Sequence, residues 1–211
     1  MAEMNGVWLL SAGLIGLIIV ALGISINGRY LGILIDSRAK MSLSRLQLVL
    51  WTWLFISALI TVALTKKTLD IEISSNLLAL MGLSVGSTAG STIIKGVKAA
   101  KRPKNPLIDQ VSCEGVLKTN GSAKYASLLD IFKGEETQDY QYIDVAKVQM
   151  FFFSLMALLA YIVILYRHEF IISETQPCAF PTISEGVLTL IGISHVGYLT
   201  VKSAPKTPTE T

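Results

Sequence analysis

The sequence predicts an all-α integral membrane protein with about five transmembrane helices, in which helices 2-3 and 4-5 form a parallel tandem repeat of a helical hairpin. The first observation behind this prediction is composition. Of 211 residues, 52% are hydrophobic and 16% are charged, whereas soluble domains carry about a quarter charged residues. Mean hydropathy is +0.56. The second observation is a set of long charge-free stretches, and the third is an internal sequence repeat.

The predicted spans cover about 7–26, 46–65, 73–94, 147–166 and 183–201. A bilayer core about 30 Å thick requires roughly 20 apolar residues per helix, and the first four stretches meet that length. The first span is not expected to be a cleaved signal peptide, because residues 1–6 contain Glu3 and no Lys or Arg. The fifth stretch is shorter and contains His195, so a buried re-entrant segment is the alternative there.

The distribution of basic residues predicts the orientation. Segments 27–45, 95–147 and 202–211 hold 15 of the 18 Lys and Arg residues. Basic loops tend to remain cytoplasmic. We therefore expect the N-terminus outside and the C-terminus in the cytoplasm, as in a bacterial inner membrane protein.

The internal repeat relates the second and third spans to the fourth and fifth. Ser44 to Leu48 and Ala146 to Met150 share the order small, basic, apolar, Gln, apolar, and residues 73–84 match 183–194 at six of twelve positions. A duplicated unit with two spans returns to its starting side, so both copies cross in the same direction. The repeat axis is then expected along the membrane normal. Chance similarity between apolar helices is the alternative.

Small residues indicate close helix packing. Gly82, Gly86 and Gly90 recur every four residues and share one helical face, and Gly192 and Gly197 occur in the fifth span. In lipid, such faces let helix backbones approach closely. A glycine-zipper contact and a homo-oligomer are therefore predicted.

Polar side chains inside the predicted spans are the candidates for a functional path. The hydroxyl groups of the third span either bond to backbone carbonyls and neighbouring helices or line a polar conduit. The two glutamines are expected to point into the bundle, because an amide facing hydrocarbon is costly. His195 has no carboxylate at helical spacing, which favours a structural histidine over a titrating one. These candidates are Gln47, Ser84, Thr88, Ser91, Gln149, Ser194 and His195.

Residues 95–145 form the predicted cytoplasmic segment between the repeats. It begins with a basic run suited to the anionic inner leaflet of the bilayer. A stripe with helical spacing at Tyr125, Leu128, Leu129 and Phe132 predicts a short amphipathic helix that lies on the membrane or packs under the bundle. An acidic stretch around Glu135 and Glu136 follows, for which a solvated turn is the expectation and a cation site without a known loop signature is the alternative. The anionic-lipid candidates are Lys95, Lys98, Lys101, Arg102 and Lys104.

The motifs of catalysis are not found, so no enzyme, cofactor or metal site is predicted. Cys113 and Cys178 are expected on opposite sides of the membrane. The basic run is juxtamembrane and lacks a companion fold, which argues against nucleic-acid binding. Three functions stay open, in the order of preference: a small pore with a Ser/Thr-lined path, a membrane scaffold that recruits a soluble cytoplasmic partner, and a small transporter built from the parallel repeat.

Overall fold

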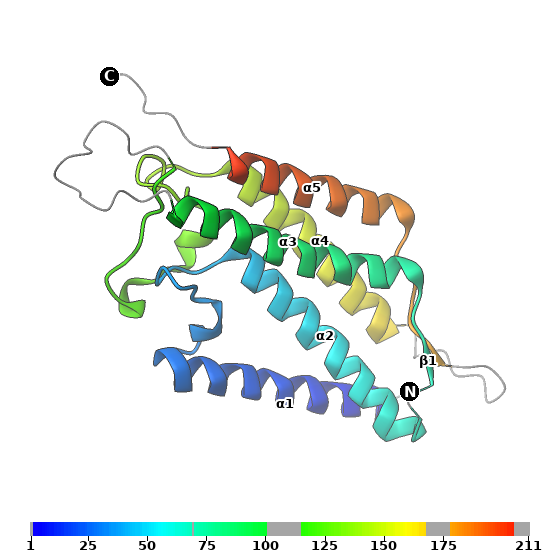
Figure 1. The fold of residues 1–211 in the computed structure, drawn as a ribbon. Coiled ribbons are helices and arrows are strands. Elements are labelled where there is room, and N and C mark those ends of the chain that lie inside the picture. Colours follow the sequence, from blue (N-terminus) through cyan, green and yellow to red (C-terminus); the bar gives the residue numbers. More distant parts are fainter. Residues whose placement is uncertain (1, 69, 101–114, 168–177, 205–211) are drawn as a thin grey trace, which may run out of the picture.

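The computed structural model describes residues 2–68, 70–100, 115–167 and 178–204. Within these residues the chain forms an elongated bundle of five α-helices (Figure 1). The prediction of an all-α fold is confirmed. Four of the helices are long and apolar enough to cross a membrane, and α5 is not among them. The helices are α1 (Ala2–Asn27), α2 (Leu43–Lys66), α3 (Ser75–Ala100), α4 (Val145–Arg167) and α5 (Glu185–Ser203).

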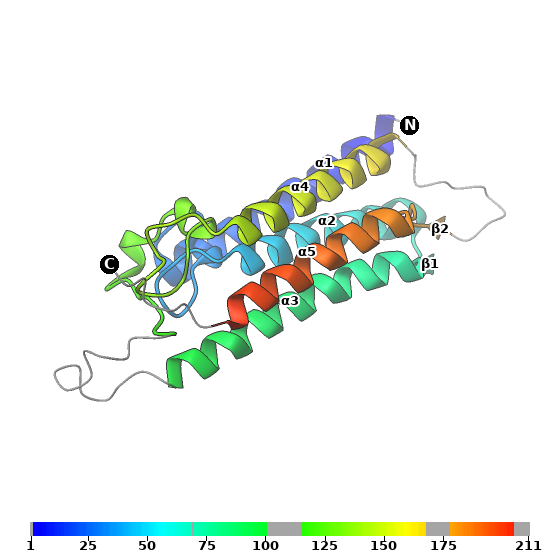
Figure 2. The ribbon, with the colours of Figure 1, turned by 90° about the horizontal axis from the view of Figure 1, so that it is seen from above.

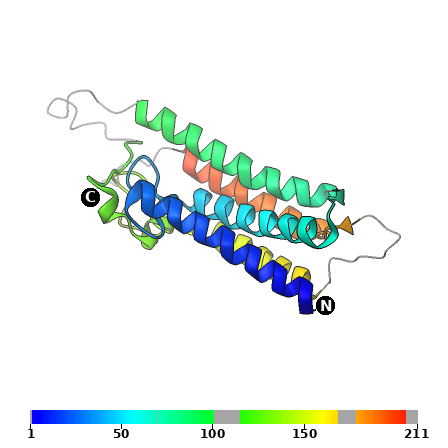
Figure 3. The ribbon, with the colours of Figure 1, turned by 90° about the horizontal axis from the view of Figure 1, so that it is seen from below.

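Helix α2 lies at the centre of the bundle, in contact with α1, α3 and α4. Helix α5 packs against both α3 and α4 (Figure 2). Helix α1 lies at the edge of the bundle beside α2, as the view from below shows (Figure 3). Successive helices alternate in direction, so the C-terminal ends of α1, α3 and α5 meet the N-terminal ends of α2 and α4. We call this the basic end and the opposite one the far end.

Polar side chains attach α1 to α2. Trp8 Nε1 donates to Ser57 Oγ at 3.2 Å, and Ser11 Oγ lies 2.9 Å from Thr61 Oγ1. Trp53 Nε1 donates to the Ala12 carbonyl at 2.9 Å. Apolar residues gain little by moving from lipid into a helix interface, so such hydrogen bonds and close packing hold the pair together.

An aromatic cluster fills the core toward the far end. The ring centroids of Trp51 and Phe55 on α2 lie 5.6 Å apart, and those of Phe55 and Tyr161 on α4 lie 5.8 Å apart. Leu77 and Leu80 of α3 are buried beside them. Offset and edge-to-face ring pairs are favourable beyond the area they bury.

Two short parallel strands close the far end. Strand β1 (Ile71–Glu72) precedes α3, and strand β2 (Cys178–Ala179) precedes α5; the register pairs Ile71 with Cys178. Asn76 Nδ2 also donates to the Ile183 carbonyl at 2.9 Å. These contacts fix the starts of α3 and α5 side by side.

Two connections cover the basic end. Residues 28–42 contain the 3-10 helix η1 (Gly32–Leu34), and 115–144 contain η2 (Ala123–Tyr125) and η3 (Leu128–Ile131). We call these two connections together the cap. The predicted amphipathic stripe therefore folds as two 3-10 helices instead of one α-helix. Phe132 packs against Phe151 of α4, whereas Tyr125, Leu128 and Leu129 are exposed.

Close contacts join the two connections of the cap to each other and to α1. Arg29 Nη1 donates to the carbonyls of Ala126 at 2.5 Å and Ala123 at 3.1 Å. A Cβ atom at Gly32 would clash with the Gly23 carbonyl of α1. Glycine is required at position 32 because the two backbones approach so closely.

Candidate functional site: a buried ionic cluster and a basic pocket

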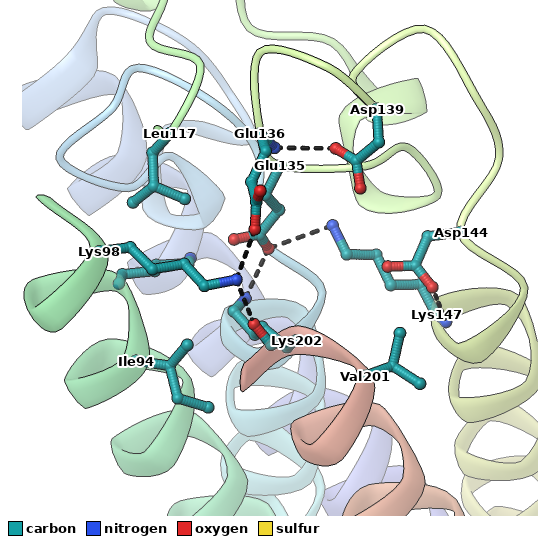
Figure 4. A pocket seen from close by; sticks show the side chains of 11 residues that line it. Ile94, Lys98, Leu117, Glu135, Glu136, Asp139, Asp144, Lys147, Val201 and Lys202 are labelled. Carbon is teal, nitrogen blue, oxygen red and sulfur yellow. Dashed lines mark hydrogen bonds and ion pairs between the residues drawn. The ribbon is translucent and has the colours of Figure 1, made fainter. Parts of the chain in front are cut away.

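Charged side chains from five segments meet inside the basic end. They come from the cap, from the last turns of α3 and α5, and from the first turn of α4 (Figure 4). These side chains form ion pairs with one another, because a buried charge without a partner is strongly unfavourable. We call this set the ionic cluster; its members are Asp36, Arg38, Lys95, Lys98, Glu135, Glu136, Lys147 and Lys202.

Glu135 lies at the centre of the ionic cluster. Its Oε1 atom lies 2.5 Å from Lys202 Nζ and 3.1 Å from Lys147 Nζ, and its Oε2 atom lies 3.3 Å from Arg38 Nη1. Burial alone would raise the pKa of this carboxyl group. The surrounding cations, Lys147 and Lys202 foremost, outweigh burial and hold the pKa well below its ordinary value.

Asp36 forms a second centre. Its Oδ2 atom accepts from Arg38 Nη2 at 2.8 Å and from Lys95 Nζ at 2.9 Å. Burial again acts to raise the pKa, but the charges of Lys95 and Arg38 lower it to about 2. Asp36 therefore joins the cap to the end of α3.

A third pair connects α3, α5 and the acidic stretch. Lys98 Nζ donates to Glu136 Oε1 at 2.5 Å and to the backbone carbonyl of Lys202 at 2.6 Å. Asp139 Oδ1 accepts from the Glu136 backbone amide at 2.9 Å (Figure 4). The acidic stretch was expected to be a solvated turn, yet Glu136 is only 3% exposed. It is buried because the last turns of two helices converge on it.

The ionic cluster carries an excess of positive charge. Arg38, Lys95, Lys147 and Lys202 share the carboxylates of Asp36 and Glu135. Removing one partner of a buried ion pair strongly destabilises a protein, because the other charge is left uncompensated. The two carboxylates are therefore the groups on which this arrangement depends.

A cavity of about 230 Å³ adjoins the ionic cluster between α2 and α3. We call it the basic pocket. Its walls carry three cations and one carboxylate together with several hydroxyl groups. The cations are Arg38, Arg45 and Lys95, and the carboxylate is Asp36.

Tyr198 connects the ionic cluster to the interior of the bundle. Lys202 Nζ donates to the Tyr198 hydroxyl at 2.7 Å. That hydroxyl lies 3.3 Å from Ser44 Oγ and 3.4 Å from Ser91 Oγ. The ammonium group of Lys202, the phenol of Tyr198 and the two serine hydroxyls thus form one hydrogen-bonded series that runs from α5 to α2 and α3.

The predicted hydroxyl stripe of α3 faces the inside of the bundle. Ser84 and Ser91 are buried, and Thr88 is half-buried. Thr88 Oγ1 is within hydrogen-bonding distance of the carbonyls of Ser84 at 2.9 Å and Ser44 at 3.1 Å. Thr88 therefore links α3 to α2 within one subunit.

Some buried polar atoms in the described part of the chain have no hydrogen-bond partner. On α3 and α5 these are Ser84 Oγ, Ser194 Oγ and His195 Nδ1, and on α2 it is Gln47 Oε1. Ser194 and His195 are both buried. Buried polar groups are normally satisfied, and ordered water is one common partner.

The two predicted glutamines differ. Gln47 is buried, and its Nε2 atom donates to Ser154 Oγ of α4 at 2.6 Å. Gln149 is exposed, so the expectation that it points into the bundle was wrong. The reason is the position of each helix: α2 has neighbours on three sides, whereas α4 has α2 and α5 as its principal helical neighbours.

The glycines divide in the same way. A Cβ atom at Gly90 would lie 3.2 Å from Leu199 of α5, and one at Gly192 would lie 3.8 Å from Leu83 of α3. Gly82, Gly86 and Gly197 have nothing within 4 Å of that position. Gly90 and Gly192 therefore bring α3 and α5 together, and the other three lie on the outside of the subunit.

The predicted lipid-binding run is also divided. Lys95 and Lys98 belong to α3 and form ion pairs with Asp36 and Glu136. Lys101, Arg102 and Lys104 lie outside the described residues. The sequence analysis did not predict the ion pairing of Asp36, Arg38, Lys147 and Lys202. One available signal was that each lies within ten residues of the end of a predicted span, on the side where basic residues collect.

No protein-family model, curated protein or solved structure matches this chain. Its class follows from the fold: four helices of membrane-spanning length and apolarity place it among the helical membrane proteins. Within the described residues, no group of three or more His, Cys, Asp or Glu side chains is arranged to hold a metal ion.

Proposed function

We propose that the protein is a membrane-embedded interaction subunit whose cap holds a soluble partner. The observation that carries this proposal is a fixed cap with large apolar side chains on its surface. Tyr125, Leu128 and Leu129 are 70%, 51% and 61% exposed. Exposed apolar groups outside the spans are typical of interaction sites, and tyrosine is frequent among the residues that dominate binding.

The ionic cluster supports this role by fixing the cap. Glu135 ties the 115–144 connection to α4, α5 and the 28–42 connection through three cations. Arg29 adds bonds to the carbonyls beside Tyr125. A surface fixed before binding loses less conformational entropy when a partner docks.

The proposed orientation puts the N-terminus outside and the cap in the cytoplasm of a bacterial cell. The positive-inside rule supports it, because the segments 27–45, 95–147 and 202–211 hold 15 of the 18 Lys and Arg residues. A membrane-impermeant thiol reagent should then label Cys178 in intact cells and leave Cys113 unlabelled. Labelling of Cys113 alone would reverse the orientation and put the cap outside.

The bundle that carries the cap is proposed to be a duplicated hairpin, with α2–α3 and α4–α5 as its two copies. The parallel pairing of β1 with β2 supports this, since each strand lies just before the second helix of its copy. A twofold axis along the strands relates parallel neighbours. Helix α1 lies outside the repeat, and the outward-facing Gly82 and Gly86 leave room for a second copy of the chain.

The interaction proposal is tested on the cap surface. A photocrosslinking amino acid at position 125 should capture a soluble protein in cells. The double substitution Leu128→Asp and Leu129→Asp should abolish that capture. A matched control, Thr119→Asp with Thr137→Asp, adds the same charge at polar positions of the cap and should leave capture unchanged.

A second measurement separates a protein partner from the bilayer surface. Leu129→Trp places a fluorophore on the same face, and brominated lipids quench tryptophan that inserts among acyl chains. Because Trp8, Trp51 and Trp53 also fluoresce, the variant is compared with the parent, and an added fluorescence from position 129 that stays unquenched agrees with a partner site. Strong quenching would show that this face lies on the membrane, and the partner proposal would fail.

The pore is the second candidate, and one specific observation favours it. Ser84 Oγ, Ser194 Oγ and His195 Nδ1 are unpartnered on the helices that also carry the Tyr198 series. Water at these atoms would extend a polar path from the basic end into the bundle. If this path conducts ions, the unmodified protein should show flux in liposomes and Thr88→Leu should block it. No flux in several lipids and at several pH values would remove the pore from consideration.

A further inference from the structure

The basic pocket has the size of a site for a small anion. Its volume is about 230 Å³, below the roughly 300–1,000 Å³ of pockets for drug-sized ligands and well above the roughly 30 Å³ that one water occupies in the liquid. It lies between the first turn of α2 and the last turns of α3. A single polyatomic ion or one lipid headgroup fits this volume.

The charge of the pocket walls is positive. Arg38, Arg45 and Lys95 line the pocket, and among the described residues Asp36 is the one lining carboxylate. Asp36 Oδ2 is already shared between Arg38 at 2.8 Å and Lys95 at 2.9 Å. The neighbouring carboxylate Glu135 is also shared, by Arg38 and two lysines. Excess positive charge in a partly desolvated cavity attracts an anion and is stabilised by it.

Arg38, which lines this pocket, has a donor that makes no hydrogen bond. The residue is only 7% exposed, and its Nη1 atom has no hydrogen-bond partner among the described groups. Its one close charge contact is Glu135 Oε2 at 3.3 Å, an ion pair without hydrogen-bond geometry. Buried donors of this kind are normally satisfied.

The start of α2 adds backbone donors. Ser42 is the N-cap residue of α2, and its side chain makes no capping hydrogen bond. Its hydroxyl instead lies 3.5 Å from Lys95 Nζ. The first-turn amides of a helix have no intrahelical partner and favour an anion.

We propose that the basic pocket binds a phosphate-type oxyanion between Arg38, Arg45, Lys95 and the first turn of α2. A planar guanidinium matches two oxygens of a phosphate group, and a lysine adds a point charge. The phosphate belongs either to a soluble ion or to an anionic lipid headgroup, and the pocket lies where α3 leaves the apolar part of the bundle. The proposal does not depend on the partner of the cap.

The experiment uses the full chain, purified in an uncharged detergent. Thermal unfolding is followed against increasing sodium phosphate and against sodium chloride at equal ionic strength. A bound ligand raises the melting temperature in a saturable manner. In a second arm, nanodiscs of phosphatidylcholine are compared with nanodiscs that also contain phosphatidylglycerol, in phosphate-free buffer.

Substitutions at the exposed Arg45 assign the effect to the pocket. Arg45→Gln should raise the ligand concentration at half-effect about tenfold, because it removes charge-assisted hydrogen bonds. Arg45→Lys keeps the charge and should give an intermediate value, which guards against a folding defect. Lys124→Gln is the matched control, since Lys124 is an exposed cation of the cap outside the pocket.

Each outcome of this experiment either supports or overturns the proposed phosphate site. Saturable stabilisation by phosphate that Arg45→Gln weakens supports a soluble ion, and stabilisation by phosphatidylglycerol alone with the same dependence supports a headgroup. Equal responses to phosphate and chloride, together with no lipid effect, would overturn the proposal. So would a phosphate or lipid effect that Arg45→Gln and Lys124→Gln leave equally intact.

Discussion

Replacing Glu135 by glutamine tests whether the carboxylate at the centre of the ionic cluster holds the basic end together. The substitution keeps the size of the side chain and removes the charge that faces Lys147, Lys202 and Arg38. Loss of one partner from a buried ion pair costs about 3–5 kcal/mol, because the remaining charge is left uncompensated. We expect a loss in that range for Glu135→Gln.

This loss should be visible in thermal unfolding of the protein in nanodiscs. For a chain of this length, about 1 kcal/mol shifts the melting temperature by roughly 2–4 °C, so Glu135→Gln should melt roughly 6–20 °C lower than the parent. The exposed Glu72 at the far end supplies the control. Glu72→Gln should melt within about 1–2 °C of the parent, since an exposed carboxylate contributes little.

The excess of cations predicts an asymmetry that a general packing defect would not produce. Lys202→Met removes one of three cations around Glu135 and leaves Lys147 and Arg38 in place. We expect it to cost about 2 kcal/mol, mainly for hydrogen bonds to charged and phenolic oxygens. Equal losses for Lys202→Met and Glu135→Gln, or a Glu135→Gln variant that melts like the parent, would refute the reasoning.

Three further predictions follow from particular contacts. The pKa of Asp36 falls from the ordinary 3.8 to about 2 in the folded protein. The contribution of this carboxylate to stability is therefore present above pH 3.8 and is lost as the pH falls through about 2. Melting temperatures measured across this window should drop, and the drop should be smaller in Asp36→Asn. Gln47→Leu should cost about 1 kcal/mol by breaking the bond to Ser154, whereas Gln149→Leu on the exposed side should leave the melt unchanged; equal effects would contradict the different placement of the two amides. Gly90→Leu should destabilise the protein by about 1–3 kcal/mol, because Leu199 lies 3.2 Å from the position of the added Cβ. Gly86→Leu should leave the melting temperature of the subunit unchanged and alter only the oligomeric state seen by size-exclusion chromatography. A lower melting temperature for Gly86→Leu would show that the face of Gly86 is covered within the bundle.

Charge-free length was the most informative sequence signal for the fold. The predicted spans 46–65 and 73–94 correspond to α2 and α3, the second beginning two residues before its helix. Backbone groups must be satisfied within the segment in lipid, so a long apolar run becomes a helix whatever surrounds it. The fifth run, with His195 inside it, also forms a helix, and its membrane-spanning role stays a prediction.

The inward and outward faces of the helices were much harder to predict. The amide of Gln149 lies outside, although its repeat counterpart Gln47 lies in a contact. The glycines at positions 82 and 86 also lie outside, although Gly90 on the same stripe packs against α5. In a soluble protein, hydrophobic periodicity identifies the buried face. In lipid the outside of a helix is as apolar as the inside, so periodicity loses that information.

The sequence by itself determined the class of protein, the helical character of its long apolar stretches and the concentration of basic residues at one end, because length, hydropathy and charge act locally along the chain. Only the tertiary structure decided that these charges are buried and shared. Glu135, Lys147 and Lys202 are far apart in sequence or on different elements, and each alone is typical of a solvated charge at the end of a helix. They become an ionic cluster because the alternating helices bring five chain segments to the same end, where burial makes each charge depend on the others.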